Sequence, residues 1–78
     1  AQAVFWLSKA AEQGFASAQF NLARKYVEGE GVSKDAAQAV YWYRKAAEQG
    51  DHMAQSNLGA MYARGEGVPK DFVASYMW

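Results

Sequence analysis

The sequence predicts an all-α protein made of stacked helix–turn–helix repeats with a period of 36 residues. Of the 42 residue pairs that lie 36 positions apart, 23 are identical, far more than chance would give. Apolar residues recur at helical spacing, and nowhere do they alternate as in a strand. One helix pair cannot bury both of its faces, whereas stacked pairs share a continuous core. We therefore expect residues 1–78 to form a single repeat array.

The first two expected helices span about residues 1–13 and 16–28. The string Lys-Ala-Ala-Glu-Gln-Gly at residues 9–14 recurs unchanged at residues 45–50. Because a glycine ends each copy, the chain is expected to turn there before the second helix of a pair begins. Gly29-Glu30-Gly31-Val32 recurs at residues 65–68, and its two glycines mark a loop after each second helix.

The next two expected helices, about residues 35–49 and 52–64, repeat this pair with clearer end signals. Asp35 is expected to be the N-cap of the first, with Gln38 completing a capping box, and Gly50 its left-handed C-cap. Its apolar face consists of Ala39, Val40, Tyr43, Ala46 and Ala47. The apolar side of the helix over 52–64, which Gly65 ends, consists of Ala54, Leu58, Met61 and Tyr62.

A fifth helix is expected over about residues 71–78, just after Pro69. So short a helix is not stable on its own and needs a neighbour. Trp6, Trp42 and Trp78 occupy one register of the repeat. Neither end carries the polar capping helix that usually closes such an array. We therefore expect a fragment of a longer protein, whose uncapped terminal helices allow self-association.

The composition argues against several classes of protein. The 8 Lys and Arg residues balance the 8 Asp and Glu residues, so nucleic acid is not an expected partner. Cysteine is absent, which excludes disulfides and zinc–thiolate sites. The longest apolar run, Ala3–Leu7, is far shorter than the roughly 20 residues of a membrane-spanning helix, so membrane insertion is not expected. The localisation stays open.

No group of residues points to catalysis, a cofactor or a metal. His52 is the only histidine and falls at a helix start, where we expect it to be exposed. Gly29-Glu30-Gly31 lacks the spacing of a phosphate-binding loop, and no Ser-x-x-Lys motif occurs. The Tyr and Trp residues recur in repeat register, which favours packing between helices over stacking on bases or sugars. We expect no enzyme, no cofactor and no metal site.

Three strings resemble the Sel1-like repeat, a relative of the tetratricopeptide repeat. They are Lys45-Ala46-Ala47-Glu48-Gln49-Gly50, Asn57-Leu58-Gly59-x-Met61-Tyr62 and Gly65-Glu66-Gly67-Val68-Pro69-Lys70-Asp71. The resemblance covers the whole chain and implies a right-handed α/α superhelical solenoid that binds proteins on its concave side. It is compatible with bacterial periplasmic, secreted and cytoplasmic proteins. Some cysteine-rich bacterial members are linked to β-lactam chemistry, which does not carry over because this chain lacks cysteine.

Comparing the two copies of one helix separates constant positions from variable ones. Between residues 16–28 and 52–64, the changes include Ser17/Met53, Phe20/Ser56, Arg24/Ala60, Val27/Ala63 and Glu28/Arg64. Their spacing places them on one helix face. By the resemblance, that face lines the groove of tetratricopeptide-like proteins. The predicted partner-binding residues are Ser17, Phe20, Asn21, Arg24, Val27, Glu28, Met53, Ser56, Asn57, Ala60 and Arg64.

Several of these residues allow two interpretations. Phe20 beside Arg24 has the composition of an interface hot spot, or else Phe20 packs against the adjacent repeat. Arg24 and Glu28 belong to the same hot spot, or else they form an exposed ion pair. The resemblance implies that Asn21 and Asn57 hydrogen-bond to the backbone of a bound peptide. The alternative is that each amide holds a neighbouring loop or helix end.

The expected function is that of a non-catalytic protein-interaction scaffold. Its partner would be a peptide or helix bound on the concave helix face. The alternatives are a structural or self-associating repeat module and a cell-wall or β-lactam-related hydrolase. The residues do not identify the partner.

Overall fold

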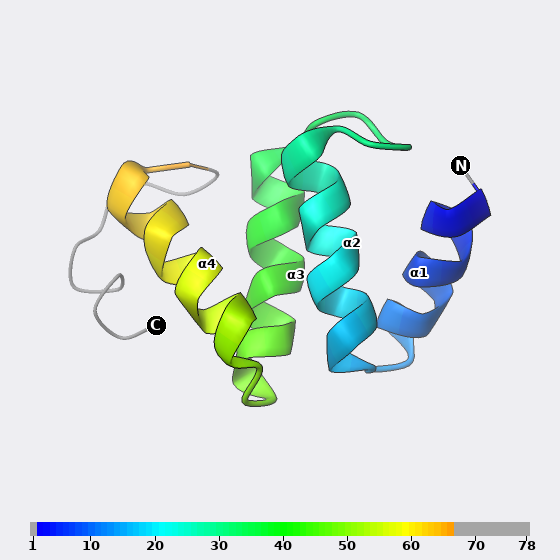
Figure 1. Cartoon of the computed structure of the whole chain (residues 1–78), viewed down its shortest axis with the longest axis horizontal. Coiled ribbons are helices and arrows are strands. Elements are labelled where there is room, and N and C mark those ends of the chain that lie inside the picture. The colour runs from blue at the N-terminus through cyan, green and yellow to red at the C-terminus, as the bar shows by residue number, and fades with distance from the viewer. Residues whose placement is uncertain (1, 67–78) are drawn as a thin grey trace.

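Four helices make up the described part of the chain, and each packs on the next (Figure 1). The computed structural model describes residues 2–66, with α1 at Gln2–Glu12, α2 at Ala16–Glu28, α3 at Ala36–Glu48 and α4 at His52–Arg64. These residues contain no strand, so the all-α prediction is confirmed. Each helix end lies within one residue of the range expected from the sequence. The helix expected over residues 71–78 lies outside the described residues.

The ends of α3 follow the sequence signals in part. Asp35 is its N-cap, as predicted, with Oδ1 accepting a hydrogen bond from the Gln38 amide at 3.1 Å. The predicted capping box is wrong, because the Asp35 amide donates instead to the Tyr26 carbonyl oxygen at 2.9 Å. Gln49 is the C-cap, and Gly50, at φ 93°, follows it in the left-handed region. Tyr26 thus joins the end of α2 to the start of α3.

Helices α2 and α4 begin with different caps, but both end at a glycine in the left-handed region, Gly29 and Gly65. Asp51 caps α4 by accepting a hydrogen bond from the Ala54 amide at 2.9 Å, a cap that the sequence analysis missed. Phe15 holds the same place before α2 and makes no side-chain cap. Gly29 ends α2 at φ 68°, and a Cβ there would lie only 3.1 Å from the Cβ of Lys34. Both its φ and the limited space therefore favour a glycine at this turn.

Each pair of helices has its own core, and the two cores consist of equivalent residues. The core between α1 and α2 contains Val4, Ala11, Ala18 and Leu22. The residues 36 positions later form the core between α3 and α4, and they are Val40, Ala47, Ala54 and Leu58. The same side chains therefore close both pairs.

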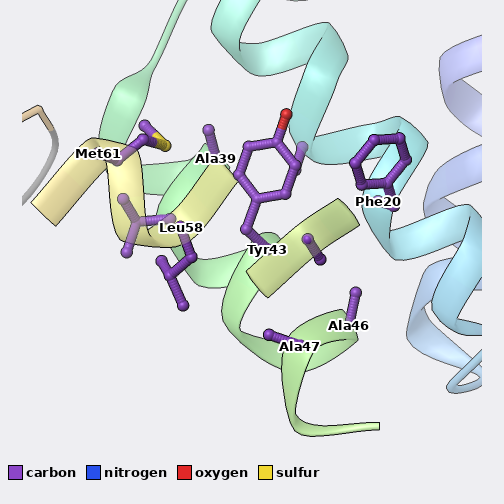
Figure 2. Packing of buried hydrophobic residues seen from close by; sticks show 10 residues of the cluster. Phe20, Ala39, Tyr43, Ala46, Ala47, Leu58 and Met61 are labelled. Carbon is purple, nitrogen blue, oxygen red and sulfur yellow. The ribbon is translucent and has the colours of Figure 1, made fainter. Parts of the chain in front are cut away.

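Packing of α2 on α3 joins the two pairs and is the most extensive helix contact of the described chain. Phe20 and Ala23 of α2 lie in one cluster with Ala39, Tyr43 and Ala46 of α3 (Figure 2). The Phe20 and Tyr43 ring centroids are 5.6 Å apart, at an interplanar angle of 58°. Burying a side chain the size of phenylalanine contributes about 1.5–3 kcal/mol. These two rings are the aromatic side chains of the cluster that joins the pairs.

Gln19 is a buried polar side chain whose hydrogen bonds explain why it recurs. Its Nε2 donates to the Ala11 carbonyl oxygen at 3.0 Å, and its Oε1 accepts from Gln49 Nε2 at 2.9 Å. Gln55 Nε2 makes the equivalent bond to the Ala47 carbonyl oxygen at 3.1 Å. The repeated bond ties the end of the first helix of each pair to the second helix. The Gln49 bond joins the two pairs.

None of the helices within residues 2–66 is both long enough and apolar enough to cross a membrane.

We predict that Gln19→Met destabilises the chain more than Gln55→Met does. Methionine has a similar volume but leaves the buried Ala11 carbonyl and the Gln49 amide without the Gln19 side chain, at a cost of about 1–3 kcal/mol. Gln55 is only half-buried and makes one bond, so its replacement should cost about 1 kcal/mol or less. Urea unfolding of both variants checks this, and equal losses would contradict it.

Candidate partner-binding surface

The predicted partner-binding residues all lie on α2 and α4, and eight of them line three hollows. The hollow between α1 and α2, here called the α1–α2 groove, has a volume of about 370 Å³ and includes Asn21, Arg24 and Glu28. A smaller one of about 70 Å³, the Tyr43 cleft, includes Val27, Asn57 and Arg64. A shallow one of about 260 Å³ on α4 includes Met53, Ser56 and Asn57.

Tyr43 of α3 connects residues from α2 and α4. Its side chain is buried, and burial raises the pKa of the phenol above its ordinary value of 10.0. The positive charge of Arg24 and a hydrogen bond from the Asn57 side chain lower that pKa, whereas the charge of Glu28 raises it. Asn57 of α4 lines the same cleft as Tyr43, and the charges of Arg24 and Glu28 reach the phenol from α2.

Phe20 is buried, with 8% of its surface exposed. The expectation of an exposed aromatic ring beside Arg24 is therefore wrong, because the α2–α3 interface takes up the ring. The alternative interpretation, packing against the adjacent repeat, describes its position. The Arg24 guanidinium lies 6.0 Å from the centroid of the Phe20 ring. Phe20 therefore contributes by supporting the Arg24 side chain from below.

The remaining predicted residues differ in exposure. Ser17 is exposed at the start of α2, and Ala60 is half-buried on α4. Within residues 2–66, the salt bridges join Lys25 to Glu30 and Arg64 to Glu66. The alternative interpretation of Arg24 and Glu28 as an ion pair is therefore wrong. Both remain exposed at the rim of the α1–α2 groove.

The sequence analysis missed the lining residues that come from the first helix of each pair. Ala3 and Leu7 of α1 line the α1–α2 groove, and Tyr43 lines the cleft that bears its name. Leu7 and Tyr43 are equivalent positions that differ between the two copies. Extending the comparison of copies to this helix would have found Leu7 and Tyr43, but not Ala3, which is identical to Ala39.

The surface offers hydrogen bonds and charges above an apolar base. Asn21 and Asn57 supply amide donors and acceptors, while Arg24 and Glu28 supply one charge of each sign. Among the described residues, no three His, Asp or Glu side chains are grouped so that they could hold a metal ion. This chemistry suits a peptide, whose backbone and side chains present the same mixture of groups.

Comparison with known proteins gives a consistent assignment. A family model for the Sel1 repeat matches residues 1–15, 16–51 and 52–78. Among solved structures, a protective antigen present in uropathogenic Escherichia coli strains, described as displaying an SLR fold, is 47% identical with a TM-score of 0.96. A Sel1 repeat protein from Oxalobacter formigenes is also 47% identical, with a TM-score of 0.94.

These comparisons concern only part of each solved protein. The match covers 99% of this chain and 16% of the Escherichia coli chain. It covers 96% of this chain and 31% of the Oxalobacter chain. No curated protein matches the chain. The likeness therefore establishes the repeat fold. It does not extend to the functions of the longer proteins, of which this chain matches only a part.

We predict that Tyr43→Phe reduces the loss of stability at alkaline pH. The pKa of Tyr43 is raised in the folded state, so the unfolded chain loses this proton first as the pH rises past 10.0. The stability that Tyr43 contributes is present below that pH and is lost as the pH rises through the folded-state pKa, at up to about 1.4 kcal/mol per pH unit. Urea unfolding from pH 8 to 11.5 checks this. Parallel stability curves for the two chains would contradict it.

Proposed function

This chain belongs to the Sel1 repeat family, and on that premise we propose that it binds a partner peptide or helix without catalysing a reaction. Sel1 repeats generally act as protein-interaction scaffolds and are generally not enzymes. The observation that carries the proposal is that eight of the predicted residues, all on α2 and α4, line three hollows on the described part of the chain. Six of the eight, all but Asn21 and Asn57, differ between the two copies, and such variation on a repeated framework is how a repeat scaffold acquires specificity.

The binding mode follows from the groups that the surface presents. The amides of Asn21 and Asn57 supply donors and acceptors to a partner's backbone, and this use is independent of its sequence. The charges of Arg24 and Glu28, at the exposed rim, select the partner's side chains. The apolar groups of Leu7 and Val27 add contact area below them.

A second candidate function, self-association, is favoured by one specific observation. Phe5 and Trp6 of α1 are 52% and 65% exposed. Exposed aromatic side chains beside one another are common at protein interfaces. Sedimentation equilibrium separates the two functions, because a scaffold for other proteins stays monomeric where a self-associating module does not.

Selection from a library of displayed peptides tests the proposed function. We predict that peptides selected on the chain bind the double variant Arg24→Ala/Asn57→Ala at least about tenfold more weakly, since truncating interface hot spots has effects of this size. Lys34→Ala is the matched control, because Lys34 is an exposed cation in the loop after α2 and lines none of the three hollows of the candidate binding surface. Circular dichroism of each variant checks that the helices remain.

Two results would overturn the proposed function. One is a library that yields no peptide for the chain. The other is a set of peptides that bind the double variant and the Lys34→Ala control equally well.

A further inference from the structure

Two further hollows lie along α3 and share no residue with the candidate partner-binding residues of α2 and α4. One, here called the Asp35 hollow, has a volume of about 250 Å³ and is lined by Asp35, Ala37, Gln38 and Tyr41. The other, the Trp42 hollow, has a volume of about 230 Å³, and its lining includes Glu12, Tyr41, Trp42 and Lys45. Residues from both helix pairs line the Trp42 hollow, so it lies where the pairs meet. Tyr41 lines both hollows and divides them.

The Tyr41 ring is held in place although 51% of the residue is exposed. It makes an edge-to-face contact with Trp42, with ring centroids 4.9 Å apart at an interplanar angle of 83°. Trp42 in turn packs against the cores of both helix pairs. The Lys45 Nζ lies 5.1 Å from the Tyr41 ring centroid. An exposed ring fixed by its neighbours is suited to binding, because little side-chain entropy is left to lose.

Exposure of an aromatic ring at this position is common to both copies of the helix. Phe5 of α1, the residue equivalent to Tyr41, is 52% exposed, and the Lys9 Nζ lies 5.0 Å from its ring centroid. Phe5 differs from Tyr41 in that it lines neither of the two hollows. The hollows, and not the exposed ring alone, therefore set α3 apart.

The spacing of the two hollows matches one turn of a polyproline II helix. Gln38 and Lys45, which line different hollows on either side of Tyr41, are seven residues or about 10 Å apart along α3. One turn of a polyproline II helix has three residues and spans about 9 Å. In an extended strand, side chains on one face are only about 7 Å apart. Residues three positions apart in a polyproline II segment therefore fit the two hollows better.

The groups around the hollows suit the backbone and side chains of such a segment. A polyproline II helix has no internal hydrogen bonds, so its carbonyl oxygens are free to accept them. The Gln38 side-chain amide, the Trp42 indole N–H and the Lys45 ammonium group are donors at the hollows. Aromatic-lined grooves bind proline-rich segments in this conformation.

The charges at the hollows favour a basic residue in the bound segment. Asp35 and Glu12 are exposed, and the salt bridges of residues 2–66 involve neither of them. Lys45 offsets the charge of Glu12 in the Trp42 hollow, whereas the Asp35 hollow contains no cation. A positive charge beside Asp35 would therefore complement the net negative charge of the site.

We propose that α3 binds a proline-rich segment of a partner protein in the polyproline II conformation. Two prolines three positions apart occupy the Asp35 hollow and the Trp42 hollow, on opposite sides of Tyr41. An arginine or lysine next to the proline in the Asp35 hollow lies beside Asp35. This surface is separate from the residues of α2 and α4, so the inference goes beyond the proposed function and does not depend on it.

The test uses the 78-residue chain and the blocked synthetic peptide Gly-Arg-Pro-Ala-Pro-Pro-Gly as the probe. The NMR signals of the Tyr41 amide and the Trp42 indole N–H locate binding, and their titration gives the Kd. One control peptide has alanine in place of its last proline, which removes the spacing of three. A second control peptide has alanine in place of arginine.

The expected result is binding of the probe that shifts both signals, with weaker binding of each control peptide. In the chain, Tyr41→Ala should weaken binding at least about tenfold, as truncating an aromatic anchor does. Phe5→Ala is the matched control and should leave binding unchanged, because Phe5 is equally exposed and lines neither hollow. Circular dichroism of each variant checks that the helices remain.

The charge at Asp35 is tested by Asp35→Asn. Asparagine is also a good N-cap, so the start of α3 should persist while the charge is removed. This variant should bind the probe up to about fivefold more weakly, the size of an exposed ion pair. Its binding of the peptide without arginine should match that of the unaltered chain.

Absence of binding would overturn this inference, as would equal binding by the unaltered chain and Tyr41→Ala. Self-association in sedimentation equilibrium that Tyr41→Ala abolishes would also overturn it, since a second copy would then be the occupant. The probe should bind Arg24→Ala/Asn57→Ala normally, whereas displayed peptides without the proline pattern should bind Tyr41→Ala normally. The inference and the proposed function can therefore fail separately.

Discussion

Phe20 of α2 and Tyr43 of α3 meet with their ring centroids 5.6 Å apart, and this contact holds two helix pairs together as one body. Each pair alone buries only one face of each helix, so the facing surfaces of α2 and α3 need each other. The alanines beside the rings, Ala39 and Ala46, are fully buried and let the two helices approach closely. A second connection runs through Gln49, whose Nε2 donates to the Gly14 carbonyl oxygen at 2.8 Å and to Gln19 Oε1. Apolar packing and the hydrogen bonds of Gln49 thus both hold the two helix pairs together.

The binding surface depends on this junction. Arg24 lies over the buried ring of Phe20, and Asn57 lines the same cleft as Tyr43, so the two rings that join the pairs also lie beneath the exposed groups. This explains how a helix with a constant core face can carry a variable outer face without loss of the fold.

The repeat made most of the fold predictable, because identical strings at equivalent places imply identical helix pairs. Asp35 was recognisable as a cap from its residue type and spacing, whereas the failure of its capping box was not. The Tyr26 carbonyl oxygen accepts a hydrogen bond from the Asp35 amide, a contact that no local sequence pattern predicts. The helices that carry the candidate site were predictable, but the burial of individual site residues was less so. Phe20 differs from its counterpart Ser56 as a binding residue would, yet the structure buries it against α3. Comparing two copies identifies positions that change and does not say which neighbour they face.

The most direct test of this account is a double-mutant cycle between Phe20 and Tyr43, measured by urea unfolding at neutral pH. Phe20→Leu, Tyr43→Leu and the double variant keep the positions apolar while removing the contact between the rings. If that contact joins the two pairs, the two substitutions should couple by about 0.5–1.5 kcal/mol, the range found for aromatic pairs. Losses of stability that add to within about 0.3 kcal/mol would contradict the account. They would mean that α2 and α3 are held together by other contacts.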